Sequence, residues 1–435
     1  MGIFFGTDGV RGVVNNDLTE ELAQMVGNAL SRKSKHTKII VGRDTRTSGS
    51  FLTTALSTGA LKGGADVIDV GIVPTAGISY LVKHLGFDYG VVISASHNPK
   101  EYNGIKIFDA SGRKLSEKEE DVLERNFASS QIVSSLKVGK YKYCPIKVNR
   151  YLDFLLKSVN GDLKGLKVVL DLANGASYKI APKVFSMLGA EVIKINASSN
   201  GKKINENCGA TNVKMLKNKV IAEKADVGFA FDGDADRLIA VDENGRIFDG
   251  DMLIYILACK FKNEGLLNAN AVVGTSHTNT GLLIALNRKK INLVRTDVGD
   301  KYVIEAMEKM NLSLGGEQSG HIIMQNLLPT GDGILASLQV ASHIIQSGKK
   351  LSQLFEAKLL CQINKNIIVS DKLKVLNNEL LTQKISAIYA QIAPIGRVLV
   401  RASGTEPKIR VMVEHTDEKL AQQYADEIEK IILSI

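Results

Sequence analysis

A short apolar run rich in β-branched residues occurs three times in this chain, and each time it leads through a loop of small residues into a helix-like segment. The runs cover residues 38–41, 167–170 and 271–274, and the segments that follow them begin GRDTR, DLANG and TSHTN. Buried strands that pass through Gly-, Ser- or Asn-rich loops into helices are typical of α/β layers with parallel strands. The three runs therefore predict three related α/β domains.

The last part of the chain has a different pattern. A helix-like stretch over residues 374–390 precedes two strand-like stretches, 397–402 and 409–414, joined by the short connection SGTEP. An amphipathic segment continues to the last residue, so this part predicts an α+β domain built on a hairpin. At about 100–200 residues per domain, 435 residues indicate three or four domains. We place the domains at residues 1–145, 146–250, 251–360 and 361–435.

The composition is that of a folded globular protein without a nucleic-acid surface. Hydrophobic residues make up 44% and charged residues 23%, which are ordinary values and exclude a disordered chain. The 55 basic residues outnumber the 46 acidic ones, but the lysines are scattered and Trp is absent. Nucleic-acid grooves need a concentrated basic stripe with stacking rings, so we expect no nucleic-acid partner. A small phosphorylated substrate needs only a few well-placed cations.

Neither a membrane segment nor a secretion signal is expected. The chain has no run of about eighteen apolar residues, and its first residues lack a charged region followed by a long apolar stretch. The four cysteines lie far apart without a C-x-x-C pair, which is typical of small buried side chains rather than of a metal site. The sequence therefore predicts a cytoplasmic protein with no membrane partner.

The segment SASHNP, residues 94–99, places a hydroxyl nucleophile beside a proton carrier. Ser96 is followed by His97, and residues 90–93 before the segment are predicted to form a buried strand. Ligands of open α/β sheets collect where strands end, and a Ser hydroxyl can carry a phosphoryl group where cations and donors offset its charge. The structural alternative is that Ser94 and Ser96 cap a helix or close a turn.

Three carboxylates at alternate positions form the second polar segment. Asp232, Asp234 and Asp236 follow a strand-like run at residues 227–231. If the segment is extended, the three carboxylates point the same way and can hold one hard cation such as Mg²⁺. Arg237 offsets the acidity and can reach a phosphate oxygen. An EF-hand is excluded because Arg237 stands where the sharp turn of that loop needs Gly, and a solvated acidic turn is the structural alternative.

Two further loops gather polar groups. In GGEQSGH, residues 315–321, Glu317 and Ser319 suit paired recognition of neighbouring hydroxyls, and the glycines permit close backbone approach. The loop RASGTEP, residues 401–407, and the strand after it combine guanidinium, hydroxyl and backbone N–H donors, which suit a dianionic phosphate ester. These donors belong to Arg401, Ser403, Gly404, Thr405 and Arg410. Ordinary polar loops are the alternative in both cases.

These four motifs, in this order, resemble those of the α-D-phosphohexomutases over essentially the whole chain. The resemblance implies four domains around a central cleft, of which three are related α/β domains with mixed sheets and the last is an α+β domain. It also implies that Ser96 is a phosphoserine. Together with Asp232, Asp234 and Asp236, phospho-Ser96 is implied to hold one Mg²⁺ ion.

The same resemblance implies roles for further side chains. Lys106, in the segment NGIK, is a proton-transfer or phosphate-orienting group, and His97 or His321 can also move protons. Arg237 stabilises charge on the transferring phosphoryl group. The residues implied to bind the sugar or its other phosphate are Arg11, Glu317, Ser319, Arg401, Ser403, Gly404, Thr405 and Arg410.

The opening FGTDGVRG, residues 5–12, and the form GGEQSGH resemble the branch of the family that acts on hexosamine phosphates. This branch implies interconversion of glucosamine 6-phosphate and glucosamine 1-phosphate through glucosamine 1,6-bisphosphate, on the route to UDP-N-acetylglucosamine and peptidoglycan precursors. Arg43, Arg295 and residues 298–301 are expected to line the cleft. Tyr102 instead resembles the branch that acts on glucose and mannose phosphates.

Three alternatives stay open at this point. A mutase of glucose or mannose phosphates would use the same groups, a sugar-phosphate phosphatase would let water attack phospho-Ser96, and a silent sensor would keep the binding loops alone. Retention of Ser96 with all three Asp residues speaks against the sensor. Hexosamine phosphates are the expected partners, and a homodimer is compatible with the sequence.

Overall fold

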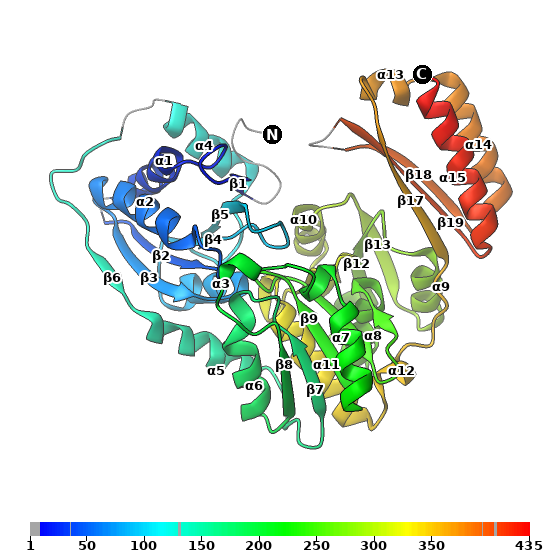
Figure 1. Ribbon diagram of the computed structural model, residues 1–435, viewed down its shortest axis with the longest axis horizontal. Coiled ribbons are helices and arrows are strands. Elements are labelled where there is room, and N and C mark those ends of the chain that lie inside the picture. The colour runs from blue at the N-terminus through cyan, green and yellow to red at the C-terminus, as the bar shows by residue number, and fades with distance from the viewer. Residues whose placement is uncertain (1–8, 35, 129–131, 394, 404–406) are drawn as a thin grey trace. The chain divides into compact units, whose positions relative to one another are not determined.

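The structure is a computed structural model that describes residues 9–34, 36–128, 132–393, 395–403 and 407–435 (Figure 1). Its contacts divide the chain into two compact units. The first comprises Met1–Ser276 and Val294–Phe355, and the second comprises His277–Leu293 and Glu356–Ile435. Within the described ranges, none of the helices has both the length and the apolar character needed to cross a bilayer.

The first sheet contains six strands and is mixed. Its order is β1 (Val10–Val13), β5 (Tyr102–Asp109), β4 (Tyr89–Ile93), β2 (Lys38–Arg43), β3 (Asp66–Ile72) and β6 (Tyr141–Tyr143). Strand β2 runs parallel to β3 and β4, whereas β5 is antiparallel to both β4 and β1. The helices of this part are α1 (Glu20–Leu30), α2 (Gly49–Lys62), α3 (Thr75–His84) and α4 (Glu117–Ala128).

Both faces of the first sheet are covered, and this explains the unbroken apolar run in β2. Ile39 and Val41 belong to a core cluster that includes residues of α1 and α2, whereas Ile40 belongs to a second cluster that includes residues of α3. Successive side chains of a strand point to opposite faces, so burial on both faces requires apolar residues at every position. The carboxyl ends of these strands carry the loops of the candidate site.

The second and third sheets are also mixed. The second has the order β11 (Ile247–Phe248), β10 (Leu238–Asp242), β9 (Val227–Phe231), β7 (Lys167–Asp171) and β8 (Glu191–Ile195). The third has the order β13 (Asn292–Thr296), β12 (Ala271–Thr275), β14 (Leu314–Gly316), β15 (Ile322–Met324) and β16 (Leu328–Gly331). The helices of this part of the first unit are α5 (Asn149–Lys157), α6 (Ile180–Met187), α7 (Lys214–Glu223), α8 (Gly250–Asn263), α10 (Asp300–Met310), α11 (Gly333–Ser347) and α12 (Leu351–Leu354). The helix α9 (Thr280–Arg288), which follows β12 in the chain, belongs to the second unit.

The second unit is built on an antiparallel sheet. Its order is β17 (Cys361–Ile368), β19 (Lys408–His415) and β18 (Arg397–Ala402). The helices that follow β17 and β19 are α13 (Lys372–Leu376), α14 (Glu379–Ile392) and α15 (Glu418–Leu433). Apolar residues of α14 and α15 share one core cluster with β19. The unit therefore has its own hydrophobic core.

The predicted fold class is confirmed, with three mixed α/β sheets and a C-terminal α+β part. The single helix predicted over residues 374–390 is wrong, because two helices occupy this stretch. Asn377 ends α13, and the side chain of Asn378 accepts the Leu381 N–H at the start of α14. An Asn side chain that caps a helix start competes with helix continuation through the same residue. The four domain ranges and the central cleft stay predictions.

Candidate active site

The serine loop, residues 94–99, begins where β4 ends and holds Ser96 in an unusual backbone conformation. Ser96 has φ 51°, in the left-handed region that a non-glycine residue adopts only where its surroundings impose it. Its N–H donates to Ser94 Oγ at 2.9 Å, and Ser94 Oγ donates to Asp44 Oδ2 at 2.7 Å. The hydroxyl of Ser96 is thereby fixed toward the interior, where its side chain is buried.

Arg46 holds the serine loop in place through hydrogen bonds to its backbone. Its guanidinium donates to the carbonyl oxygens of Ser96 at 3.0 Å and Asn98 at 2.8 Å, and also to those of Pro99 and Tyr102. Asp44 neutralises the charge of Arg46, because Arg46 Nε donates to Asp44 Oδ2 at 2.9 Å. Both side chains are fully buried. Sequence reasoning missed this pair, although both residues lie in GRDTR.

Arg43, which the sequence placed at the cleft, has a different partner. Its Nη1 lies 3.0 Å from both carboxylate oxygens of Asp69 on β3. Strands β2 and β3 are parallel neighbours, with Val41 opposite Asp69 and Arg43 opposite Ile72, so the side chains of Arg43 and Asp69 lie within reach of each other. Arg43 is therefore in a structural ion pair.

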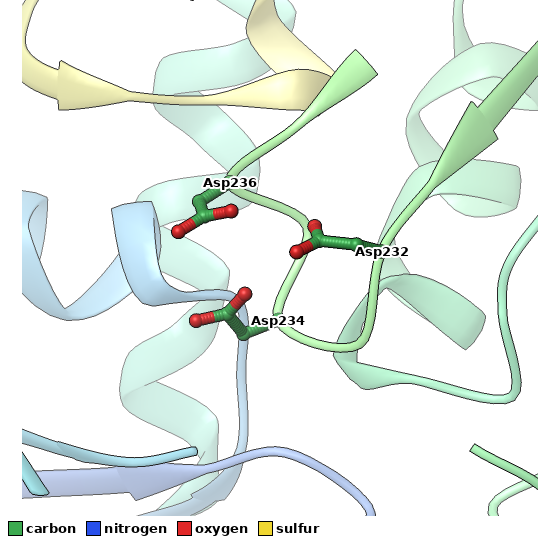
Figure 2. A group of neighbouring side chains, drawn as sticks. All are labelled: Asp232, Asp234 and Asp236. Carbon is green, nitrogen blue, oxygen red and sulfur yellow. The ribbon is translucent and has the colours of Figure 1, made fainter. Parts of the chain in front are cut away.

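The metal loop, residues 232–237, brings three carboxylates together (Figure 2). Asp232, Asp234 and Asp236 are buried, and one ligand oxygen from each lies within 4.8 Å of the others. The segment is not extended, because Ala235 has φ 60° and its N–H donates to the Asp232 carbonyl at 3.1 Å. A tight turn, rather than strand alternation, makes the carboxylates converge.

The serine loop and the metal loop meet directly. Ser96 Oγ donates to Asp232 Oδ2 at 2.5 Å and lies 3.3 Å from Asp236 Oδ1. A Cβ on Gly233 would lie 2.5 Å from the Ser96 carbonyl oxygen, so only glycine allows this approach. On its other side Ser96 Oγ lies 3.3 Å from His97 Nδ1. Burial, together with Arg237 and Arg11, lowers the pKa of His97 to about 4.

Lys106, on β5, reaches the same carboxylates. Its Nζ donates to Asp234 Oδ2 at 2.8 Å and to Asp236 Oδ2 at 3.1 Å, and its side chain is buried. Burial alone would lower the pKa of Lys106, but Asp234 and Asp236 outweigh burial and raise it. Lys106 is therefore an ammonium group that supplies charge and hydrogen bonds.

The Asp triad fits a hard divalent cation. Burial, followed by repulsion from Asp236 and Asp234, raises the pKa of Asp232 well above its usual range. Asp234 Oδ1 is buried and has no hydrogen-bond partner among the described residues. Three carboxylates with one spare buried oxygen form the all-oxygen donor set that Mg²⁺ prefers, and a divalent cation would relieve their repulsion.

Arg237, His321 and Arg11 lie at the edge of this centre. Arg237 N donates to Asp232 Oδ1 at 3.2 Å, and its backbone forms a bridge with that of His321. His321 is buried, with Nδ1 3.9 Å from Asp236 Oδ2 and Nε2 3.6 Å from the carboxylate of Asp300. Arg11, on β1, donates to the side chain of Asn98 in the serine loop at 3.4 Å.

The segment GEQSGH forms a loop that is tied to its neighbours in the first unit. Glu317 Oε1 accepts the Gly299 N–H at 3.0 Å, and Gln318 Nε2 donates to Asp249 Oδ2 at 3.2 Å. The bond from Gly299 to Glu317 brings residues 298–301 to this loop, and their place in the cleft stays a prediction. Ser319 is exposed.

The predicted phosphate loop lies in the second unit and is described in part. Gly404 and Thr405 lie outside the described residues, as do residues 5–8 of the opening motif. Arg401 and Arg410 stand directly opposite each other on β18 and β19, and Arg410 Nη2 donates to Ser403 Oγ at 3.4 Å. Like charges at such positions repel unless an anion lies between them.

His277 is a further residue of this cluster that sequence reasoning missed. Its Nε2 lies 3.3 Å from Arg401 Nη2, and a cavity of about 200 Å³ is lined by His277, Arg401 and Arg410. Burial, followed by Arg401, Arg397 and Arg410, lowers the pKa of His277 to about 4. The sequence feature that could have pointed to His277 is its position in TSHTNTG, a loop that follows one of the three repeated strands.

Family models match almost the whole chain. They are described as phosphoglucomutase/phosphomannomutase alpha/beta/alpha domains I, II and III and C-terminal domain, and match residues 2–132, 149–245, 249–360 and 365–431. A protein of Acetivibrio thermocellus named phosphoglucosamine mutase is 46% identical, and one of Clostridium tetani with the same name is 45% identical. In both comparisons 99% of each chain is covered.

Solved structures share the fold. A phosphoglucomutase/phosphomannomutase family protein from Burkholderia thailandensis has a TM-score of 0.82 at 22% identity, covering 98% of this chain and 97% of that one. An N-acetylphosphoglucosamine mutase from Aspergillus fumigatus, in complex with GlcNAc-6P and magnesium, has a TM-score of 0.65 at 18% identity, covering 99% and 95%. The resemblance carried by the motifs is thus confirmed, and this chain belongs to the phosphoglucomutase/phosphomannomutase family and is a phosphohexomutase.

Proposed function

We propose that this chain interconverts glucosamine 6-phosphate and glucosamine 1-phosphate by way of a phosphorylated Ser96. The observation that carries the proposal is the buried Ser96 hydroxyl, which donates to Asp232 at 2.5 Å within a triad of carboxylates. The names of relatives that are 45–46% identical over 99% of the chain support glucosamine phosphates as the substrate class.

The first half-reaction transfers the phosphoryl group from Ser96 to the sugar. The bond between phosphorus and Ser96 Oγ breaks as a bond forms between phosphorus and the free hydroxyl oxygen of the sugar phosphate. The pKa of His97 is lowered to about 4 by burial, Arg237 and Arg11, so its imidazole is neutral and can accept the proton that the sugar hydroxyl gives up. His97 Nδ1, 3.3 Å from Ser96 Oγ, then passes this proton to the oxygen that the phosphoryl group has left. The product of this step is glucosamine 1,6-bisphosphate.

The second half-reaction runs in the opposite sense. The bisphosphate turns around and gives its other phosphoryl group back to Ser96, so the same groups serve both ends of the sugar. The Lys106 ammonium and Arg237 stabilise charge on the transferring group. A Mg²⁺ ion held by the Asp triad and phospho-Ser96 would withdraw charge from that group, and the magnesium complex of the Aspergillus fumigatus enzyme supports this metal.

The remaining predicted residues bind the substrate in two groups, one at the sugar and one at its second phosphate. Glu317 and Ser319 bind sugar hydroxyls, and Arg11 binds near the serine loop. Arg401, Ser403 and Arg410, together with Gly404 and Thr405 of the same loop, bind the phosphate that is not being transferred. The cytoplasmic location, the homodimer and the lack of a nucleic-acid partner stay predictions.

A direct assay tests the proposal against its rivals. The purified protein is given glucosamine 6-phosphate, glucose 6-phosphate or mannose 6-phosphate with Mg²⁺ and a trace of the matching bisphosphate, and both the 1-phosphate and free phosphate are followed. The proposal predicts that glucosamine 6-phosphate has the highest kcat/KM and that no free phosphate accumulates. A higher kcat/KM for glucose 6-phosphate or mannose 6-phosphate would show that the protein is a mutase of those sugars, as Tyr102 suggests. Release of one free phosphate per substrate consumed would show that it is a phosphatase.

A further inference from the structure

A second cavity lies in the first unit, and Ser96 is not among the residues that line it. This rear cavity has a volume of about 330 Å³ and is lined by residues from the ends of β2 and β3, from α5 and from the start of α6. Its polar lining consists of Arg43, Tyr143, Tyr178, Lys179, Lys183 and Asn149. None of these residues has a role in the reaction proposed above. The volume lies at the lower end of the range of small-molecule sites, roughly 300–1,000 Å³.

The rear cavity has a positive charge. Arg43 is held by Asp69, whose carboxylate also accepts the Tyr141 hydroxyl at 2.9 Å, so the guanidinium is fixed before any ligand arrives. Neither Lys179 nor Lys183 lies within ion-pair distance of a carboxylate of the described chain. The cavity therefore combines three cations with one carboxylate, an arrangement that favours an anionic ligand.

The start of α6 strengthens this preference. Lys179 precedes the helix and Lys183 lies in its first turns, where no acidic residue is present. The free N–H groups at a helix start carry a partial positive charge, so two lysines there repel the helix dipole unless an anion is bound nearby. Lys179, Lys183 and Arg43 thus line the same cavity. The single carboxylate of Asp69 does not neutralise all three positive charges.

The other walls of the rear cavity are apolar and aromatic. Val70, Ile72 and Leu152 line it together with the rings of Tyr143 and Tyr178. Gly71 leaves room for the first ring, because a Cβ there would lie 3.0 Å from the Tyr143 hydroxyl. A simple inorganic anion would leave these walls in contact with water. An aromatic ring that carries one anionic group satisfies both parts of the lining.

Two walls of the rear cavity are bonded to the metal loop. Pro74 lines the cavity, and the next residue, Thr75, donates its N–H to the Asp234 carbonyl at 3.0 Å and its hydroxyl to Asp234 Oδ2 at 2.5 Å. Ala176 also lines the cavity and donates its N–H to the Gly233 carbonyl at 2.8 Å. A ligand that displaces either wall therefore moves the carboxylate loop.

We propose that the rear cavity is an effector site for a small aromatic anion, such as an aryl phosphate or aryl sulfonate, and that its occupation changes the affinity of the Asp triad for a divalent cation. The coupling acts through Thr75 and Ala176, which donate hydrogen bonds to Asp234 and Gly233 of the metal loop, whereas Ser96 donates to Asp232. Because coupling between two binding sites is reciprocal, the metal must change the affinity of the anion by the same factor.

The binding test uses 1-naphthalenesulfonate as the probe. The chain contains no Trp, so the fluorescence of the naphthalene ring can be followed with little interference. We expect saturable binding of one probe per chain that excess glucosamine 1-phosphate does not displace. Lys183→Glu should weaken the probe at least about tenfold, because a like charge then faces the sulfonate. Lys157→Glu, the same change at an exposed site on α5 outside the cavity, should leave its affinity unchanged.

Tyr143→Ala provides a second variant, because its side chain is 56% exposed and its removal spares the core. This variant should weaken the probe while circular dichroism and thermal midpoint stay those of the unaltered protein. Absence of saturable binding, displacement by glucosamine 1-phosphate, or equal affinities in Lys183→Glu and Lys157→Glu would each overturn the site. The coupling is measured by calorimetric titration of Mg²⁺ with and without saturating probe, and identical Mg²⁺ affinities would overturn the effector role.

Discussion

Ser96 and Asp232 are 136 residues apart in the chain, yet the hydroxyl of one donates to the carboxylate of the other at 2.5 Å. The two residues lie in loops that follow strands of different sheets, β4 and β9, and each loop contains a residue with positive φ, Ser96 itself in one and Ala235 in the other. Gly233 lets the two loops approach, and Arg46 fixes the serine loop through its carbonyl oxygens. The contact is therefore built by backbone geometry on both sides.

Arg46→Ala should destabilise the protein strongly. The substitution leaves Asp44 buried without its cation and leaves carbonyl oxygens of the serine loop without their donor. Breaking a buried ion pair by removing one partner costs about 3–5 kcal/mol. Urea unfolding of the variant, compared with Arg150→Ala at an exposed position on α5, measures the effect. Equal stability of the two variants would show that the clamp is dispensable.

Asp234→Asn should weaken Mg²⁺ binding at least about tenfold, since a charged oxygen ligand is lost from the triad. Excess Mg²⁺ should restore part of the activity. Calorimetric metal titration of this variant and of Asp162→Asn, an exposed carboxylate outside the site, gives the comparison. The same Mg²⁺ affinity in both variants would mean that the metal loop is only a buried turn.

The sequence predicted the strands of this site but not the way in which its loops turn. The strand predicted over residues 227–231 is confirmed as β9, and all five of its residues are buried, as its run without polar side chains fits. The turn at Ala235 has no such signal, since alanine rarely adopts positive φ and only the contacts around it impose that conformation.

The role of Arg46 was hidden for a related reason. GRDTR offers two arginines, and the sequence alone does not show which one turns inward. The acceptors of Arg46 are carbonyl oxygens of residues 96–102, which are brought near only by the parallel pairing of β2 with β4. His277 was missed because its partner Arg401 lies 124 residues further along the chain. Contacts between distant segments are set by packing rather than by local pattern.

Asp332→Asn should flatten the pH dependence of stability. Asp332 caps α11, accepts the Tyr151 hydroxyl at 2.7 Å, and burial raises its pKa to about 6. Between about pH 4 and pH 6 the folded state holds a proton on Asp332 that the unfolded state has already released. The free energy of unfolding therefore falls by about 3 kcal/mol as the pH rises through this range. Asn also caps helices well and lacks this proton.

The measurement for Asp332 is urea unfolding at pH 4.5 and pH 7. The stability of Asp332→Asn relative to the unaltered protein should rise between these two values. A constant difference would show that Asp332 titrates at its ordinary pKa.

Arg410→Ala should weaken both glucosamine phosphates to a similar degree. In the function we propose, the guanidinium donates a charged hydrogen bond to whichever phosphate is not transferred, and losing such a bond costs about 1.5–3 kcal/mol. The bisphosphate should also be released more often. Glu317→Gln, by contrast, should impair recognition of the sugar ring more than that of its phosphate. Steady-state constants in both directions and the rate of bisphosphate release check this division, and unchanged values for Arg410→Ala would place the phosphate contact elsewhere.

The central claim is that Ser96 carries the phosphoryl group, and mass spectrometry tests it most directly. The purified protein, incubated with glucosamine 1,6-bisphosphate and freed of small molecules, is analysed intact and after proteolysis. We predict one phosphate per chain, mapped to Ser96 and absent from a folded but inactive Ser96→Ala variant. Isotope-labelled phosphate on Ser96 should pass to the sugar when glucosamine 6-phosphate is added, while the protein stays phosphorylated. Phosphate on Ser94, or an active Ser96→Ala variant, would contradict the account.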